Sequence, residues 1–324
     1  MKLITKIEVP KFDFSISHNT LIGFTGSCFA ENIGNKLDNL KFKVQVNPLG
    51  INYNPLSLGQ SIKRIINQNL ITENDLFLAN DLWNSYDFHS KFSSKNKDEA
   101  IEKINDAVLN SHQFLKSADY LFISFGTSYV YKLKSGNIVS NCHKQADNNF
   151  ERILLTTEEI VEFWLQLLKE IKEFNPKLKL VFTISPIRHK RDGFIANQLS
   201  KSILFVAVNQ LKSKFDNVYY FPSYEIMMDE LRDYRFYKED MIHPSELAVD
   251  YILERFGDTF FGDETKEINK KISKILAALN HRPFNTDLSN YKEHLENVLH
   301  DIEDLERQYP YLKLNAEKKQ IEPS

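Results

Sequence analysis

The chain alternates short apolar runs with amphipathic helical segments, and this alternation constrains its fold more than any other feature. Continuous apolar runs are typical of strands that are buried on both faces of a parallel sheet. The five predicted strands are Thr20–Thr25, Phe42–Val46, Tyr120–Phe125, Leu178–Ile184 and Val218–Phe221. Helices between successive parallel strands make right-handed crossovers and cover both faces of the sheet. We therefore predict an α/β fold with a five-stranded parallel sheet, doubly wound and flavodoxin-like.

Apolar residues three and four positions apart indicate the helices. The predicted helices span about residues 29–40, 55–67, 98–117, 156–171, 195–213, 224–231 and 245–256. The helix that begins at Thr156 carries a possible capping box, because Glu159 follows three residues later. Residues 74–97 are polar and aromatic, and residues 127–155 are rich in Asn, Lys and Ser, so we expect both segments to be connections.

The pattern changes after about residue 262. Two apolar stripes at helical spacing, Ile268–Leu279 and Tyr291–Leu305, predict a helical hairpin joined by His281–Phe284. Such stripes pack on a core or make a dimer contact, so a homodimer through these helices is one expectation. The tail from about Leu314 is predicted to be disordered. The predicted domains are an α/β domain over residues 1–262 and a helical extension with its tail over residues 263–324.

The composition excludes several classes of partner. The chain has 41 basic and 44 acidic residues and a net charge of −3, which gives no electrostatic case for binding nucleic acid or an anionic membrane. It shows no apolar run of signal-peptide length and none long enough to span a bilayer, so we expect a cytoplasmic protein. Cys28 and Cys142 are the only cysteines, and each is expected to be a free thiol.

Three segments that each contain a glycine directly follow predicted strands, at residues 26–28, 47–50 and 126–128. The carboxyl ends of parallel strands meet at one edge of a sheet, and ligands bind beyond that edge in open α/β folds. We therefore expect these three segments to converge on one site.

The first of these segments places Ser27 and Cys28 between a strand and a helix. Free backbone N–H groups and the helix dipole favour negative charge at a helix N-terminus. A thiol so placed is expected to have a lowered pKa and to react as the thiolate. The structural alternative is that Ser27 caps the helix while Cys28 fills the core, and the sequence leaves both interpretations open.

Asp240 and His243 lie three residues apart just before the last predicted helix of the α/β region. An aspartate can hold an imidazole in one tautomer and stabilise its cation, which makes the pair a candidate general base. Pro244 restricts the backbone of His243 and so its approach. The alternative is an ordinary surface pair at a turn.

The sequence Gly-Ser-Cys-Phe-Ala at residues 26–30 is the motif that gives the GSCFA family its name, and the chain resembles this family from about residue 20 to residue 256. Companion segments similar to those of the family lie at residues 47–50, 53–55, 125–128, 141–144, 185–189, 221–225 and 240–243. The family is grouped with the SGNH (GDSL-like) hydrolases. This grouping implies a serine or cysteine nucleophile, a histidine base and an oxyanion hole.

The resemblance to SGNH hydrolases assigns the nucleophile and the base. Those enzymes carry a nucleophilic serine third in a Gly-Asp-Ser motif, and an ungapped match places Cys28 there, with Ser27 at the aspartate. Ser27 stays the alternative nucleophile. The family's last motif, Asp-x-x-His, matches Asp240 and His243 directly. A Cys–His pair is a known arrangement for nucleophilic catalysis.

The same resemblance suggests oxyanion donors. Gly50 matches the glycine of the family's second motif, and Ser128 falls where an asparagine is usual. Ser128 has a shorter reach, so Asn141 or Asn47 is the alternative donor. The loss of one such donor typically lowers the rate about 100- to 1,000-fold.

Two further groups of residues are weaker candidates for the site. Arg188 and His189 follow a predicted strand end and could bind an anionic or hydroxyl-rich substrate, or be ordinary loop charges. Cys142 and His143, with Cys28 and His243, contain metal-ligand side chains. Because these are scattered and no C-x-x-C pair exists, we predict no metal site, and no residue suggests a cofactor.

The sequence as a whole predicts acyl transfer at a Cys/Ser–His–Asp site, by an esterase or acylhydrolase that acts on an ester of a hydroxyl compound. The expected partner is a small-molecule or glycan ester; the carbohydrate is suggested by the wider superfamily alone. Two alternatives stay open: an acyltransferase of polysaccharide or glycan modification, and a non-catalytic binding or scaffold protein.

Overall fold

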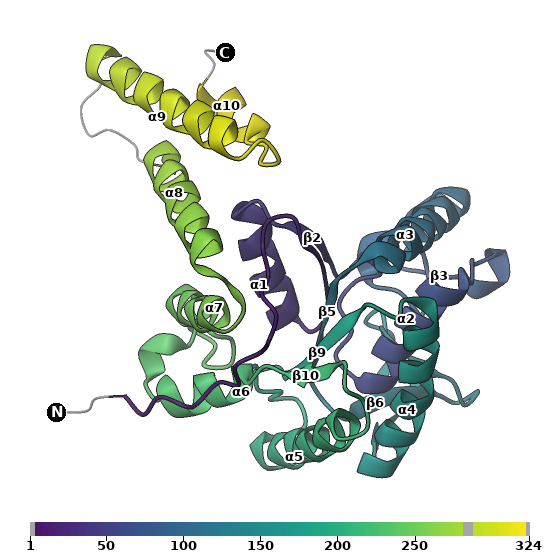
Figure 1. Cartoon of the computed structure of the whole chain (residues 1–324). Coiled ribbons are helices and arrows are strands. Elements are labelled where there is room, and N and C mark those ends of the chain that lie inside the picture. The colour runs from purple at the N-terminus through teal and green to yellow at the C-terminus, as the bar shows by residue number, and fades with distance from the viewer. Residues whose placement is uncertain (1–3, 281–287, 322–324) are drawn as a thin grey trace.

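The computed structural model describes residues 4–280 and 288–321. The predicted hairpin linker His281–Phe284 lies outside these residues. Five parallel strands form the central sheet in the order β10-β9-β5-β1-β2 (Figure 1). Their bounds are β1 Leu21–Gly26, β2 Lys43–Val46, β5 Tyr120–Phe125, β9 Lys179–Ile184 and β10 Val218–Tyr220. This order is that of a flavodoxin-like, doubly wound sheet, which confirms the predicted fold class.

The side chains of the sheet alternate between two separate cores. Tyr120 and Phe122 of β5 pack with helices on one face, whereas Leu121, Ile123 and Phe125 pack on the other. The period of two along a strand produces this division. All six residues of β5 are buried, which explains why its sequence reads as a continuous apolar run.

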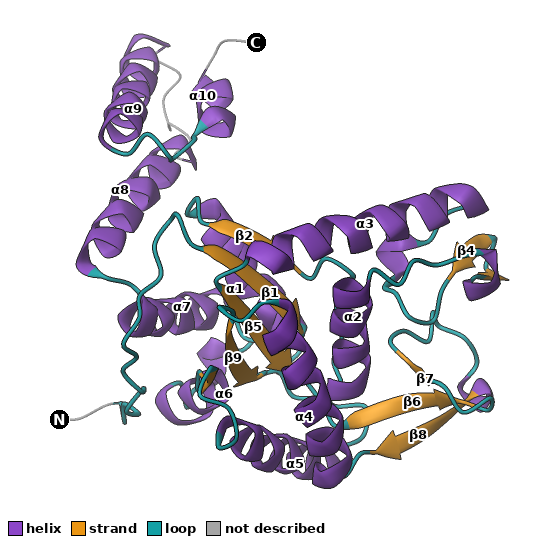
Figure 2. Cartoon of the chain, turned by 45° about the vertical axis from the view of Figure 1, so that its right-hand side comes forward, coloured by secondary structure: helices purple, strands orange, loops and turns teal. Residues whose placement is uncertain are grey.

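The helices lie on the two faces as the cores require (Figure 2). The first face is covered by α1 (Cys28–Asn39) and α7 (Glu246–Phe260). The second is covered by α2 (Pro55–Asn67), α3 (Lys97–Ser117), α4 (Thr157–Phe174) and α5 (Phe194–Lys212). The predicted capping box at Thr156 and Glu159 is confirmed, since each side chain accepts the backbone N–H of the other residue.

Both predicted connections contain strands that the sequence analysis missed. Residues 74–97 include a hairpin of β3 (Phe77–Ala79) and β4 (Leu82–Asn84), with 3₁₀ turns η1 (Glu73–Asp75) and η2 (Ser90–Phe92). Residues 127–155 form an antiparallel sheet of order β7-β6-β8. Its strands are β6 Tyr129–Leu133, β7 Ile138–Val139 and β8 Phe150–Leu154, and the 3₁₀ turn η3 (Asp147–Asn149) precedes β8. These strands are short and mostly half-buried, so they contain no continuous apolar run from which they could be predicted.

A third core holds the C-terminal helices α8 (Asp263–Asn280), α9 (Leu288–Gln308) and α10 (Asn315–Ile321), which extend away from the sheet (Figure 1). The prediction of a disordered tail is wrong for α10. Leu314 is fully buried in this core, and Lys318 Nζ lies 2.6 Å from Glu306 Oε2. Burial of Leu314 and this ion pair order the segment. The domain boundary after residue 262 stays a prediction.

The segment between β10 and α7 is compact but irregular. It contains α6 (Ser223–Glu225), the π-helix η4 (Ile226–Glu230) and the 3₁₀ turn η5 (Tyr234–Phe236). It leads to Asp240 and His243 at the start of α7. None of the helices in the described ranges is long and apolar enough to cross a membrane.

Gly26 ends β1 with φ at +124°, and a Cβ there would clash with the backbone carbonyl of Ser124 on β5. We expect Gly26→Ala to lower the free energy of unfolding by about 3 kcal/mol or more, because a rigid backbone group must move. Gly136→Ala is the matched control, since φ is +101° and nothing lies within 4 Å of its Cβ. That variant should lose only about 1 kcal/mol. Equal losses in urea unfolding would contradict the steric argument.

Candidate active site

The carboxyl edge of the sheet opens into a cleft of about 530 Å³. Segments from six parts of the chain line it, including the ends of β1, β5 and β9 and the turn before α7. The residues that carry the argument are Cys28, Tyr53, Asn141, Arg188, His189 and His243, and all six line the cleft. Of the three segments predicted to converge, residues 26–28 and 126–128 contribute to the lining, whereas the segment 47–50 ends one residue before the lining residue Ile51.

Ser27 serves as the structural cap of α1. Its side chain is 1% exposed, its Oγ accepts the backbone N–H of Phe29 at 3.2 Å, and it lies 2.8 Å from Ser124 Oγ. An N-cap oxygen that satisfies a free N–H of the first turn stabilises the helix. The hydroxyl of Ser27 is therefore engaged in holding α1 against β5, although Ser27 also lines the cleft.

Cys28 is the first residue of α1, where a backbone N–H has no partner within the helix. Its Sγ lies 3.3 Å from the Tyr53 hydroxyl. Burial raises the pKa of the Cys28 thiol above its usual value, and this outweighs the hydrogen bond from Tyr53 that lowers the pKa. The expectation of a lowered thiol pKa is therefore wrong: desolvation exceeds the effect of the helix N-terminus. Cys28 rests as a thiol and needs a base.

Asp240 holds the imidazole of His243. Asp240 Oδ2 lies 2.6 Å from His243 Nδ1, and Oδ1 accepts the backbone N–H groups of Ile242 and His243, each at 2.9 Å. The backbone N–H of His243, its side chain and the N–H of Ile242 lower the pKa of Asp240 to about 2. A carboxylate partner places the proton on Nδ1, so Nε2 is the basic nitrogen.

Cys28 and His243 line the same cleft from opposite ends of the α/β sequence. Across the described residues no hydrogen bond joins them, and the sulfur is hydrogen-bonded to the Tyr53 hydroxyl. Catalytic hydrogen bonds are often long or absent without substrate and form in the complex. The structure thus brings both halves of the predicted site to one cavity and leaves the thiol held by Tyr53.

Three of the predicted oxyanion donors lie outside the lining of the cleft. The N–H of Gly50 donates to the Asn47 carbonyl at 2.8 Å. The Asn47 side chain is buried and its Oδ1 accepts the N–H of Gly26 at 2.8 Å. Ser128 is fully buried, and its hydroxyl contacts Ser200 on α5. These contacts engage the Gly50 N–H and the Ser128 hydroxyl. The Nδ2 of Asn47 is buried without a hydrogen-bond partner, but Asn47, Gly50 and Ser128 all lie outside the lining of the cleft.

Other donors do reach the cleft. Asn141 lines it, and its Oδ1 accepts the N–H of His143 at 2.8 Å, which leaves the amide Nδ2 to donate. Ile51 also lines it, and in the part of the chain that the structure describes its backbone N–H has no hydrogen-bond partner. Ile51 follows Gly50 by one residue, so the loop that the family motif marks reaches the cleft at Ile51 and not at Gly50.

The sequence analysis also missed Tyr53 and His89 as residues of the cleft. His89 Nδ1 accepts the N–H of Lys91 at 3.2 Å, and burial, then Lys91, lowers the pKa of His89. A Cβ on Gly50 would clash with His89, so the glycine permits this close approach. Tyr53 lies within a segment that the family motif contains. His89 lies in the connection formed by residues 74–97, where no hydrophobic periodicity could reveal it.

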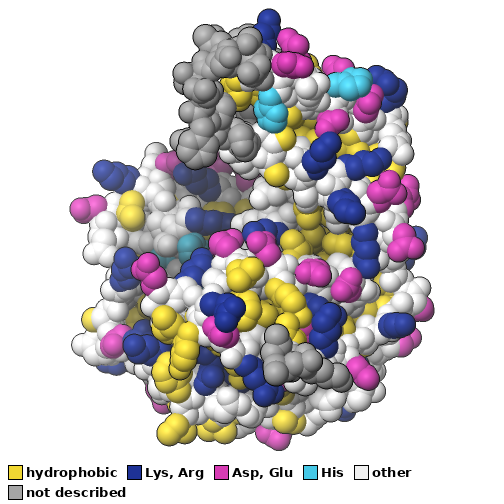
Figure 3. Space-filling view, turned by 90° about the vertical axis from the view of Figure 1, so that its left-hand side faces the viewer, with side chains coloured by type: hydrophobic (Ala, Val, Ile, Leu, Met, Phe, Trp, Pro, Cys, Tyr) yellow, Lys and Arg dark blue, Asp and Glu magenta, His cyan; other side chains and the backbone are white. Residues whose placement is uncertain are grey.

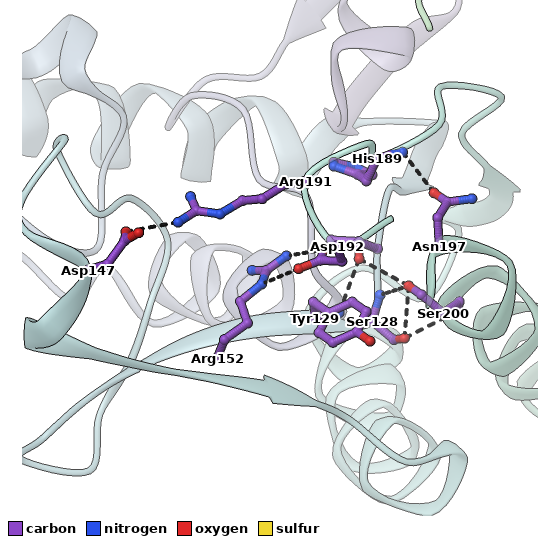
Figure 4. A network of polar contacts seen from close by, with 10 residues as sticks. Ser128, Tyr129, Asp147, Arg152, His189, Arg191, Asp192, Asn197 and Ser200 are labelled. Carbon is purple, nitrogen blue, oxygen red and sulfur yellow. Dashed lines mark hydrogen bonds and ion pairs between the residues drawn. The ribbon is translucent and has the colours of Figure 1, made fainter. Parts of the chain in front are cut away.

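The loop between β9 and α5 carries the predicted Arg188 and His189, both of which line the cleft. Figure 4 shows His189 in this loop. The backbone N–H of His189 donates to Asn197 Oδ1 at 2.7 Å, and its ring packs edge-on against Tyr53 at 5.6 Å. Burial, followed by the charge of Lys201, lowers the pKa of His189 to about 4. His189 is therefore neutral near pH 7 and contributes shape and hydrogen bonding.

The predicted absence of a metal site concerns Cys142 and His143. Cys142 lines the cleft, but His143 Nε2 lies 2.7 Å from the Ser85 carbonyl in a buried position. Within residues 4–280 and 288–321, no group of three His, Cys, Asp or Glu side chains is placed to hold a metal ion.

A flavodoxin-like sheet whose carboxyl edge carries a cysteine, a histidine and an aspartate defines an α/β protein with a candidate nucleophile–base site. The chain belongs to the GSCFA family, which matches residues 21–256. Residues 272–323 match the C-terminal domain of GSCFA domain proteins.

No curated protein matches the chain. Several solved structures are similar to it, including two carbohydrate esterases. A carbohydrate esterase family 3 protein from Talaromyces cellulolyticus is 9% identical, with a TM-score of 0.34, over 78% of this chain and 97% of its own. A Clostridium thermocellum family 3 carbohydrate esterase is 14% identical, with a TM-score of 0.32, over 78% of this chain and 96% of its own.

Lys201 on α5 underlies the loop that carries Arg188 and His189. The side chain is fully buried, its Nζ donates to the Ser185 carbonyl at 2.6 Å, and burial, then the charge of Arg188, lowers its pKa to about 7. The unfolded chain therefore binds one more proton between about pH 7 and about pH 10.5, so this lysine makes stability rise with pH in that window.

We expect Lys201→Met to remove that pH dependence. The stability of the wild type relative to the variant should rise by up to about 3 kcal/mol between about pH 7 and about pH 9.5. Urea unfolding at a series of pH values measures the difference, in which the titration of other groups cancels. Lys212→Met, at an exposed position on the same helix, is the control. A difference that stays constant with pH would show that Lys201 titrates normally.

Proposed function

We propose that this protein is a thiol-dependent acyl-transfer enzyme, an esterase or acylhydrolase that acts on an ester of a hydroxyl compound. One observation carries the proposal: Cys28 and the Asp240-bonded His243 line the same cleft, whereas the hydroxyl of Ser27 is engaged as a helix cap. This arrangement favours Cys28 over Ser27 as the nucleophile.

In the first half-reaction, His243 Nε2 takes the proton of the Cys28 thiol as the sulfur attacks the ester carbonyl. The tetrahedral intermediate then collapses, the C–O bond breaks, and the imidazolium gives its proton to the leaving alkoxide. The products of this step are an alcohol and a thioester on Cys28. Asp240, ionised at all but very acid pH, keeps Nδ1 protonated and stabilises the imidazolium.

In the second half-reaction, water attacks the thioester carbonyl while His243 takes one of its protons. The C–S bond breaks, the carboxylic acid leaves, and the proton returns to the sulfur. The oxyanion of both intermediates lies beside the N–H of Cys28 at the start of α1, with the Ile51 N–H and Asn141 Nδ2 as further donors. An acceptor hydroxyl in place of water gives acyl transfer from the same intermediate, and product analysis with and without a glycan acceptor separates the two.

The proposal predicts an acyl-enzyme on Cys28. With p-nitrophenyl acetate, we expect mass spectrometry to find one acetyl group on the peptide that contains Cys28. Cys28→Ala should abolish it, and His243→Ala should slow its formation about 100-fold or more, because the thiol is then left without a base.

The matched control is Ser27→Ala, which lowers stability by about 1 kcal/mol through the lost cap and keeps the acetyl adduct. An adduct that depends on Ser27 would transfer the nucleophile to that residue. No adduct in the wild type, together with no effect of His243→Ala, would favour a non-catalytic binding protein.

Tyr53 gives a second prediction, which concerns the pKa and the reactivity of the Cys28 thiol. The hydroxyl of Tyr53 lowers the pKa of the Cys28 thiol against the effect of burial, so its removal should raise that pKa further. In Tyr53→Phe we therefore expect iodoacetamide to alkylate Cys28 about three- to tenfold more slowly at a pH below the thiol pKa. Tyr129→Phe, which removes a hydroxyl elsewhere in the cleft, is the control. Faster alkylation in Tyr53→Phe would mean that the hydroxyl protects the sulfur instead.

A further inference from the structure

The charges of the cleft differ from those of the rest of the chain. The lining includes Arg152, Arg188, Lys190 and Arg191 and not one aspartate or glutamate among its described residues. The chain as a whole has more acidic than basic residues. Figure 3 shows acidic and basic side chains interspersed over one outer face of the molecule. A cavity lined by charges of one sign attracts ligands of the opposite sign.

Two of the four cations are neutralised by ion pairs that hold the loop in place (Figure 4). Arg152 of β8 contacts both carboxylate oxygens of Asp192, at 3.0 and 2.7 Å. Arg191 lies 2.8 Å from Asp147 Oδ1 on η3. These pairs tie the loop between β9 and α5 to the β7-β6-β8 sheet, and they leave no net charge of their own.

Arg188 and Lys190 have no carboxylate within ion-pair distance among the described residues. The Nε of Arg188 is buried without a hydrogen-bond partner, and its terminal nitrogen reaches only the Phe194 carbonyl, at 3.5 Å. Arg188 also lines a neighbouring groove, and its guanidinium lies over the Phe194 ring, 5.6 Å from the ring centroid. A partly desolvated guanidinium without a counterion is costly, and a bound anion offsets that cost.

Charges of both signs lie near Cys28. Glu31 of α1 acts electrostatically on Cys28, Tyr53 and His89, and Lys91 acts on His89 more strongly than Glu31 does. The unpaired cations belong to the loop that follows β9, so an anionic group is attracted to that loop.

We propose that the ester substrate carries an anionic group, a phosphate or a carboxylate, which Arg188 and Lys190 bind while the ester carbonyl lies at Cys28. The orientation of the substrate in this inference rests on the proposed function, whereas the anion subsite rests only on the cations of the loop.

Isothermal titration calorimetry with pyrophosphate and with digalacturonate tests the subsite, and the two probes distinguish a phosphate from a carboxylate source. We expect at least one to bind, and Arg188→Gln/Lys190→Gln to weaken that binding about tenfold or more, because charged hydrogen bonds are lost. The matched control, Lys134→Gln/Lys214→Gln, removes the same charge from exposed positions outside the cleft and should change binding less than twofold. The bound probe should also slow alkylation of Cys28 by iodoacetamide.

Two outcomes would overturn the subsite. One is that neither probe binds the wild type. The other is that both double variants weaken binding equally, which would indicate attraction by net charge alone. Thermal unfolding of each variant shows whether the fold is intact. Cys28→Ala separates the two proposals, since it abolishes the acyl-enzyme and should keep probe binding; failure to form the adduct with intact probe binding would reject only the proposed reaction.

Discussion

The close contact of Gly26 with its neighbours fixes the geometry on which the site depends. The N–H of Gly26 donates to Asn47 Oδ1 at 2.8 Å, and its carbonyl accepts the N–H of Asn52 at 3.0 Å. The next residue, Ser27, donates its N–H to the Ser124 carbonyl at 3.2 Å. The end of β1 is thereby joined to β5 and to the loop after β2. Because Ile51 and Tyr53 flank Asn52 in that loop, the same contacts bring them to Cys28.

The state of Cys28 results from two opposing effects. The N-terminus of α1 and the hydrogen bond from Tyr53 stabilise a thiolate, whereas burial and the nearby Glu31 disfavour it. Burial is the larger effect, so the thiol stays protonated until a base accepts its proton. In the proposed reaction, the Asp240–His243 pair accepts that proton. A resting thiol also reacts more slowly with adventitious electrophiles than a resting thiolate does.

The sequence predicted the features that local patterns encode. Apolar runs located all five strands of the parallel sheet, and Thr156 with Glu159 marked a helix start. The spacing of Asp240 and His243 placed the carboxylate within reach of Nδ1. The predictions failed where contacts between distant segments decide. Ser128 is held by Ser200, seventy-two positions away, and no pattern around residue 128 contains that information. The β7-β6-β8 sheet depends likewise on pairing between strands whose sequences are individually unremarkable in hydropathy.

Helix α1 links two parts of the molecule that are otherwise far apart. Its first residue is Cys28 in the cleft, and just beyond its last turn Leu40 packs against the third core and Lys41 lies 2.5 Å from Glu317 of α10. At 1.5 Å per residue the helix spans about 18 Å. A chain shortened before α8 would therefore remove one of the two cores that Leu40 packs against, and would leave Lys41 without its carboxylate partner, at the far end of the helix that begins at Cys28. The C-terminal helices therefore support the end of α1, and their removal would change the surroundings of that helix.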